Sequence, residues 1–181
     1  MKENILRIFE GMAEVLVVPE KFFQKTLEDK KPMNGLYFLI FFAALLGFMA
    51  GGLSSNFLVA IIFAVLLIVL AVIKTLIWAI ISYLVAIFIF KGEGDFKNTF
   101  GLFGFISVSY LLGIFGLATL MLTGSVFSSF LLGLLMIIWM VVIAAVAVDA
   151  EHKIGIGKSF LSVMGIPALI IIVISLILGV L

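Results

Sequence analysis

One positively charged side chain stands alone in the longest apolar stretch of the chain. Residues 57–90 are thirty-four residues that contain a single charge, Lys74. A charge inside a membrane segment is costly, so such a residue is by default a candidate for ion or proton transfer or for contact with a substrate. A long lysine side chain can also carry its amine to the headgroup region. Lys74 is therefore a candidate functional residue, and snorkelling or structural pairing is the favoured role.

Three carboxylates beside the apolar stretches complete the set of candidate functional residues. Asp149 follows a long uncharged segment and is the expected salt-bridge partner of Lys74. Glu93 and Asp95 lie in a polar loop, and a second polar loop holds the one histidine, His152. Carboxylates with an imidazole can bind several metals. The spacing here is not that of a dense ligand set, so we expect solvated loop charges and no metal site.

No group of residues indicates a nucleophile together with its base. The chain has no cysteine and one histidine, which excludes disulfides, thiolate chemistry and multi-histidine metal centres. Serines within the apolar stretches lack a histidine partner, and serines in membrane helices usually bond to backbone carbonyls or neighbouring helices. The glycine pairs Gly92/Gly94 and Gly155/Gly157 lack the strand and lysine spacing of a phosphate loop. We expect neither an enzyme nor a cofactor.

These residues must be positioned by membrane helices. The chain is 65% hydrophobic and 12% charged, with a mean hydropathy of +1.44, whereas soluble domains are about 45–50% apolar and about 25% charged. Several uncharged segments exceed the roughly 18 residues that indicate a membrane span. The composition predicts an integral multi-pass membrane protein in contact with the lipid bilayer. A net charge of +1 provides no large basic face, so nucleic acid is not an expected partner.

The uncharged segments predict an all-α bundle of five transmembrane helices. Ser54-Ser55-Asn56 and Thr123-Gly124-Ser125 supply tight turns, and polar loops occupy 91–99 and 149–158. The expected domains and spans are a cytoplasmic segment at 1–32 and a membrane domain at 33–181, with helices at about 35–53, 57–90, 100–122, 127–148 and 159–181.

The distribution of basic residues decides how often residues 57–90 cross the bilayer. With one crossing, the N-terminal segment and both polar loops share a side that holds ten of the eleven basic residues. With a hairpin at Lys74 and two crossings, the basic residues divide seven against four. The positive-inside rule favours the first arrangement, and no glycine, proline or asparagine adjoins Lys74 to form a tight turn. We predict one crossing, a cytoplasmic N-terminus and an extracytoplasmic C-terminus.

Residues 1–32 predict one or two amphipathic helices that lie in the membrane interface. Apolar residues recur there at helical spacing, and Pro19 suits the first position of a second helix. Phe9, Phe22 and Phe23 are the expected interface anchors. Packing of these helices on the spans as a plain lid is an open alternative.

Small residues at Ala43, Gly47 and Gly51 are four positions apart in the first span. This pattern lets helix backbones approach closely in lipid. We expect the stripe to pack against another helix of the same chain, and the alternative is a homo-oligomer contact.

The order of several short motifs resembles that of a known membrane family. Pro19-Glu-Lys-Phe22-Phe23 precedes the first span, Gly92-Glu-Gly94-Asp-Phe96-Lys97 follows the long span, and Gly155-Ile-Gly157-Lys158-Ser159 precedes the last. Over roughly residues 19–181 the chain resembles the Yip family of multi-pass proteins. Residues 104–109 lack the tyrosine and proline of a pattern that is common in the family, which places the chain among divergent, prokaryotic members and implies the cell membrane.

The resemblance implies a non-enzymatic role at the cytoplasmic face. Eukaryotic members are linked to Rab-type GTPases and vesicle traffic, but they carry longer N-terminal regions than the one here, so GTPase binding is not expected. We expect a scaffold, a membrane-shaping element or a module that recruits an unidentified cytoplasmic protein. The alternative is a small dimeric transporter or channel that uses Lys74 in a polar path.

Overall fold

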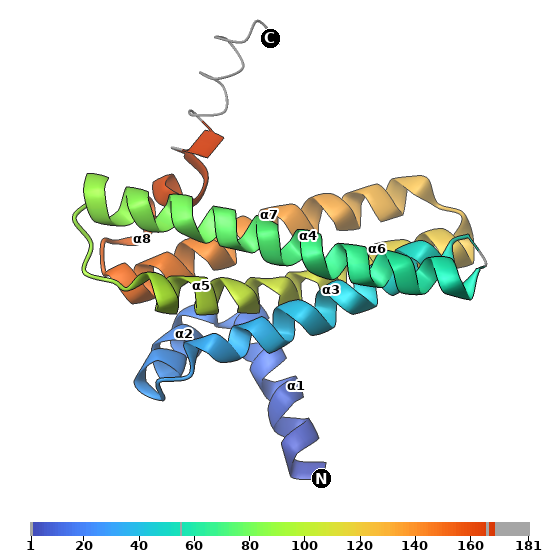
Figure 1. The fold of residues 1–181 in the computed structure, drawn as a ribbon, viewed down its shortest axis with the longest axis horizontal. Coiled ribbons are helices and arrows are strands. Elements are labelled where there is room, and N and C mark those ends of the chain that lie inside the picture. Colours follow the sequence, from blue (N-terminus) through green and yellow to red (C-terminus); the bar gives the residue numbers. More distant parts are fainter. Residues whose placement is uncertain (1, 55, 166, 169–181) are drawn as a thin grey trace, which may run out of the picture.

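The computed structural model describes residues 2–54, 56–165 and 167–168, with side chains from Glu10 onward. Within these ranges the chain forms helices joined by short turns (Figure 1). The helices are α1 Lys2–Val17, α2 Pro19–Glu28, α3 Gly35–Gly52, α4 Phe57–Leu84, α5 Phe96–Phe105, α6 Tyr110–Thr123, α7 Val126–His152 and α8 Ile156–Phe160, with 3-10 turns at Pro32–Asn34 and Ile106–Ser109 and π-helical turns at Val85–Ile89 and Leu161–Gly165.

Within the residues that the structure describes, four helical segments are long and apolar enough to cross a membrane: Pro32–Gly52, Phe57–Ile89, Phe96–Thr123 and Val126–His152. They lie side by side along the long axis of the bundle (Figure 1). The predicted all-α, multi-pass architecture agrees with these segments. The predicted fifth span, residues 159–181, lies mostly outside the described residues.

The apolar stretch around Lys74 is one continuous helical span. α4 passes through Lys74 without a break and continues into the turn Val85–Ile89. The stretch contains neither glycine nor proline, the two strongest helix breakers. At its start, Asn56 Oδ1 accepts the first free backbone N–H groups, the nearer at 2.9 Å. The prediction of one continuous helix is therefore confirmed, and the hairpin alternative is wrong.

Both polar loops are shorter than predicted, because the flanking helices extend further. α5 begins at Phe96, four residues early, since Asp95 Oδ2 accepts the backbone N–H of Asn98 at 3.3 Å and caps the helix. α7 continues four residues beyond its predicted end, to His152. It stops where Lys153 adopts the left-handed conformation, with φ at 54°.

The two ends of the bundle differ in composition. One end, called the polar end below, consists of the segment 29–34, the loop 91–95 and the residues 153–155. The opposite end holds the turn between α3 and α4 and the turn between α6 and α7 (Figure 1). A cavity of about 490 Å³ lined by both Lys30 and Lys97 joins the N-terminal segment to the start of α5. This grouping is the one that a single crossing by α4 requires.

The start of α3 and the middle of α5 touch backbone to backbone. A Cβ added to Gly35 would overlap the carbonyl of Gly101, and one added to Gly104 would overlap the backbone of Gly35. Only glycine permits so close an approach. As a result α5 lies at the centre of the bundle, where Leu102 and Phe103 are almost fully buried.

The stripe of small residues in α3 packs against α4 of the same chain. A Cβ on Gly47 would lie 2.6 Å from the Phe63 carbonyl oxygen, and one on Gly51 would lie 2.6 Å from Ala60 Cα. Ala43 and both glycines are buried. Intramolecular packing is therefore confirmed, and these residues are not exposed for the alternative homo-oligomer contact.

The N-terminal helices pack on the spans, as in the lid alternative. α2 begins with Pro19 at its first position, as predicted. Phe23 is fully buried, and the ring centroid of Phe22 lies 5.0 Å from that of Phe105. Full burial corrects the expected use of Phe23 as an interface anchor, whereas Phe22 is only partly buried and its use as an anchor stays a prediction. The side chain of Phe9 lies outside the described residues.

Replacing Gly104 with alanine should destabilise the protein by about 1–3 kcal/mol, as for other overpacked contacts. The added methyl group would overlap the backbone of Gly35. Thermal unfolding of the purified protein in detergent measures the effect. Gly133→Ala is the matched control, since a Cβ there meets nothing within 4 Å, and its melting temperature should equal or slightly exceed that of the wild type. Equal melting temperatures for the two variants would contradict the backbone contact.

Candidate functional site: the polar end of the bundle

A glutamate of α7 fastens the loop 91–95 to the end of that helix. Glu151 Oε1 accepts hydrogen bonds from the backbone N–H of Asp95 at 2.7 Å and from the side-chain amide of Asn98 at 3.1 Å. Hydrogen bonds to a charged acceptor are stronger than those between neutral groups. The start of α5 and the end of α7 are thus held as one unit.

His152 is the buried centre of the polar end, with 1% of its surface exposed. Its Nε2 lies 2.9 Å from Thr99 Oγ1. The single hydroxyl proton of Thr99 is donated to the carbonyl oxygen of Asp95 at 2.9 Å, so the threonine oxygen must accept from Nε2–H. Nδ1 has no hydrogen-bond partner within the described chain. A proton there would be a buried, unsatisfied donor, so this geometry fits the neutral imidazole with one fixed tautomer.

The glycine pair of the loop has a packing role that the sequence did not reveal. A Cβ on Gly94 would lie 2.6 Å from His152 Nδ1, and one on Gly92 would lie 2.9 Å from His152 Cβ. The ring of Tyr83 lies 5.8 Å from the imidazole on the α4 side. The one available signal was a lone histidine in a loop predicted to share a side with these glycines. Sequence spacing cannot predict a contact between segments so far apart in the chain.

The structure brings the three candidate carboxylates to the polar end, as predicted, but gives them separate roles. Asp95 caps α5, and Asp149 Oδ1 accepts the backbone N–H of Gly155 at 2.7 Å. The side chain of Glu93 is exposed, and its backbone N–H donates to the carbonyl oxygen of His152 at 3.4 Å. Among the described residues, no group of three or more His, Asp or Glu side chains could hold a metal ion. In this region Asp95 and Asp149 accept backbone N–H groups and so fix the loops and helix ends.

Lys74 has an aromatic partner in place of the expected carboxylate. Its Nζ donates a hydrogen bond to Tyr110 Oη at 3.0 Å and lies 5.3 Å and 5.6 Å from the ring centroids of Tyr110 and Trp78. Such cation–π contacts stabilise an ammonium group outside bulk water. Trp78 is itself fixed, since its Nε1–H donates to the carbonyl oxygen of Val163 at 3.0 Å. The expected pairing with Asp149 is wrong because that carboxylate caps the 153–155 turn.

Lys74 lies near the middle of its helix, and its span continues for fifteen residues beyond it. Tyr110 is likewise near the middle of the span Phe96–Thr123. Neither of the two cavities beside α2 is lined by Lys74, so the geometry gives no support to the polar path of the transporter alternative.

Comparison of the chain with models of protein families shows which family it belongs to. The model described as the Yip1 domain matches residues 13–177, nearly the whole chain. The protein belongs to the Yip1 domain family. Searches of the curated proteins and of the solved structures gave no match. The resemblance inferred from the short motifs is confirmed.

Two of the motifs that carry the resemblance to the Yip1 family form the polar end or adjoin it. Residues 92–97 supply the glycines beside His152 and the first turn of α5. Residues 155–159 start α8, where Ser159 Oγ donates to the carbonyl oxygen of Gly155 at 3.1 Å. Residues 104–109, which depart from the common family pattern, include the 3-10 turn in the middle of the third span. In this Yip1-domain protein the motif residues shape helix ends and turns.

Replacing Thr99 with valine should loosen the polar end, because the buried Nε2–H of His152 loses its acceptor. A buried donor without a partner costs about 1–3 kcal/mol. Limited trypsin digestion of the purified protein should then cut after Lys91 and Lys97 about fivefold faster or more, since cleavage follows local opening.

Thr119→Val is the control for this experiment. Thr119 is partly buried and donates to the carbonyl oxygen of Phe115 within its own helix, so the same chemical change leaves the polar end intact. Its digestion rate should match the wild type. An unchanged rate for Thr99→Val would show that the pair with His152 does not hold the loops.

Proposed function

We propose that this protein is a non-enzymatic membrane scaffold that recruits a protein partner at its polar end. Yip1 family proteins are membrane-trafficking proteins. The observation that carries the proposal is the fastening of three distant segments into one surface, through Glu151, His152 and the cavity shared by Lys30 and Lys97. At the opposite end of the bundle the chain forms two tight turns, one between α3 and α4 and one between α6 and α7.

The polar end presents charges that the folded chain leaves exposed. They are Asp29, Lys30, Lys31, Lys91, Glu93, Asp95 and Lys153, and Lys97 and Lys158 add two more from the adjoining first turns of α5 and α8. Mixed charges with an excess of lysine suit a partner surface that is net acidic, and complementary charge gives specificity and fast association. Loops already fixed by hydrogen bonds lose little entropy on binding. Both features favour binding of a protein partner over catalysis of a reaction.

We further propose that the polar end faces the cytoplasm of a cell membrane. This orientation places the N-terminus in the cytoplasm and, with a fifth span at 159–181, the C-terminus outside. The support is the ten-to-none division of basic residues outside Lys74.

Photo-crosslinking tests the recruitment proposal. A photoreactive phenylalanine derivative at Lys97 or Lys153, both exposed, should give an adduct with one and the same protein in membranes of the source cells. The matched control is Phe127, which is 71% exposed at the other end of α7 and should give no such adduct. Lys74→Met should leave the adducts unchanged. Equal yields at both ends, or no adduct at the polar end, would contradict the proposal.

Single cysteines test the orientation without background, because the chain has none of its own. Ser54→Cys and Ser125→Cys should react with a membrane-impermeant maleimide on intact cells. Glu93→Cys and Ile156→Cys should react only after the cells are permeabilised. Reaction of Glu93→Cys on intact cells would exclude a cytoplasmic polar end.

A further inference from the structure

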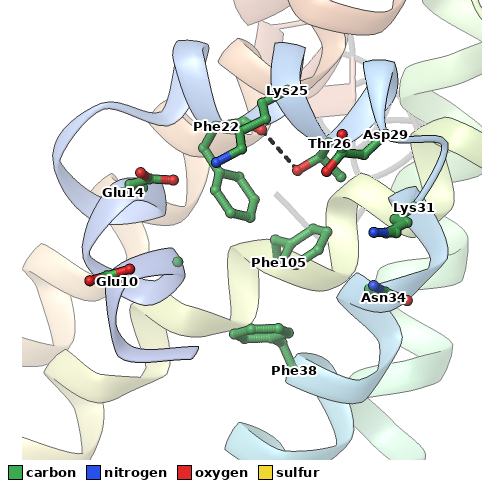
Figure 2. A pocket seen from close by; sticks show the side chains of 11 residues that line it. Glu10, Glu14, Phe22, Lys25, Thr26, Asp29, Lys31, Asn34, Phe38 and Phe105 are labelled. Carbon is green, nitrogen blue, oxygen red and sulfur yellow. Dashed lines mark hydrogen bonds between the residues drawn. The ribbon is translucent and has the colours of Figure 1, made fainter. Parts of the chain in front are cut away.

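A cavity of about 610 Å³ lies between the N-terminal helices and the spans (Figure 2). Small-molecule sites usually measure about 300–1,000 Å³. The lining comes from α1, α2, the segment 29–34, α3 and α5, so the cavity exists only when the N-terminal helices are docked. None of its lining residues belongs to the cluster around His152.

Three phenylalanine rings form the floor of this cavity. Phe105 lies between Phe22 and Phe38, with centroid distances of 5.0 Å and 5.1 Å (Figure 2). Aromatic faces attract cations and also cover apolar groups. The floor therefore suits a ligand that has both a cationic group and an apolar part.

The charged side chains that line the cavity are three acids and two bases, which leaves a net charge of −1. Figure 2 shows Glu10 and Glu14 of α1 on one side of the floor, Lys31 with Asn34 and Asp29 on the other, and Lys25 of α2 near Phe22. The two glutamates are one helical turn apart and so share a face of α1. The hydrogen bond drawn among the lining residues is internal to α2. These polar groups are thus open to a ligand.

The cavity is at the depth where a bilayer lipid can reach it. Lys31 immediately precedes the first span, which begins at Pro32. Phe38 follows Asn34 by four residues, about 6 Å along the helix axis. Charged walls therefore lie at the start of the span, and the aromatic floor extends into it. A molecule with a polar headgroup and acyl chains matches that gradient.

We propose that the cavity binds a zwitterionic phospholipid through its headgroup. The ammonium of an ethanolamine or choline headgroup lies between Glu10 and Glu14, above the aromatic floor. The phosphate binds the ammonium of Lys31 and the amide of Asn34. An anionic phospholipid brings no ammonium to this net negative lining, and the resulting repulsion gives the specificity. The inference does not depend on partner recruitment or on which side the polar end faces.

Native mass spectrometry of the full chain in detergent tests this assignment. With matched acyl chains, phosphatidylethanolamine should bind about tenfold more tightly than phosphatidylglycerol. Glu10→Gln/Glu14→Gln should weaken phosphatidylethanolamine binding about tenfold. Glu20→Gln/Glu28→Gln removes the same charge from exposed positions of α2 outside the cavity and should bind as the wild type does.

Two further measurements, on the Lys31→Gln variant and on competition by soluble phosphoethanolamine, test which ligand the cavity binds. Lys31→Gln should weaken both lipids, because both carry the phosphate. Equal wild-type affinity for the two lipids, or wild-type binding by the Glu10/Glu14 variant, would overturn the proposal. Soluble phosphoethanolamine should compete only weakly, since it lacks the acyl chains that cover the floor. Competition at equal concentration would assign the cavity to a soluble zwitterion and overturn the lipid assignment.

Discussion

The contact between Gly35 and Gly104 holds two membrane helices at backbone distance. In lipid, apolar surface gains little by moving from acyl chains to a neighbouring helix, so association depends on close packing and on small residues that permit it. This contact makes α5 the central element of the bundle. Phe105 follows Gly104 directly and is thereby placed between Phe22 and Phe38. The cavity of the N-terminal helices depends on the same glycines.

The polar end shows how two helix termini can satisfy each other. The beginning of α5 presents free backbone N–H groups, and the end of α7 supplies the Glu151 carboxylate and the His152 ring. A buried polar network of this kind is stable only when its members are paired. Thr99 completes it by donating to the Asp95 carbonyl and accepting from the imidazole. The loop therefore has a defined shape before any partner binds.

Charge and helix-breaker patterns predicted the features that depend on local sequence. The continuous α4, the turn at Gly124 and the shared end of the two polar loops all follow from such patterns. α5 and α7 each extend about one turn beyond their predicted bounds, because their ends are set by capping residues and hydropathy alone does not identify a cap. The order of the motifs indicated the family, and the match over residues 13–177 confirmed it.

Long-range partners could not be predicted, for a physical reason. In a membrane protein an apolar stripe can face lipid or protein at similar cost, so the pattern around Phe23 was compatible with an interface anchor although the residue is buried. The choice of Tyr110 over Asp149 by Lys74 has the same origin, since it depends on how α4 and α6 are placed. His152 was visible as a lone histidine, but its contact with Gly94 requires the fold.

The unequal lengths of the spans bear on the surrounding bilayer. The span Phe57–Ile89 has 33 residues, against 21 for Pro32–Gly52, or about 50 Å against about 32 Å of helix. The hydrocarbon layer is about 30 Å thick. Hydrophobic mismatch is therefore concentrated on the flank of α4, where large apolar side chains such as Ile62 and Val65 face outward. Tilting or local thickening relieves it at fractions of a kcal/mol per Å. A thicker membrane reduces this mismatch, so the length of one helix affects which bilayer suits the protein.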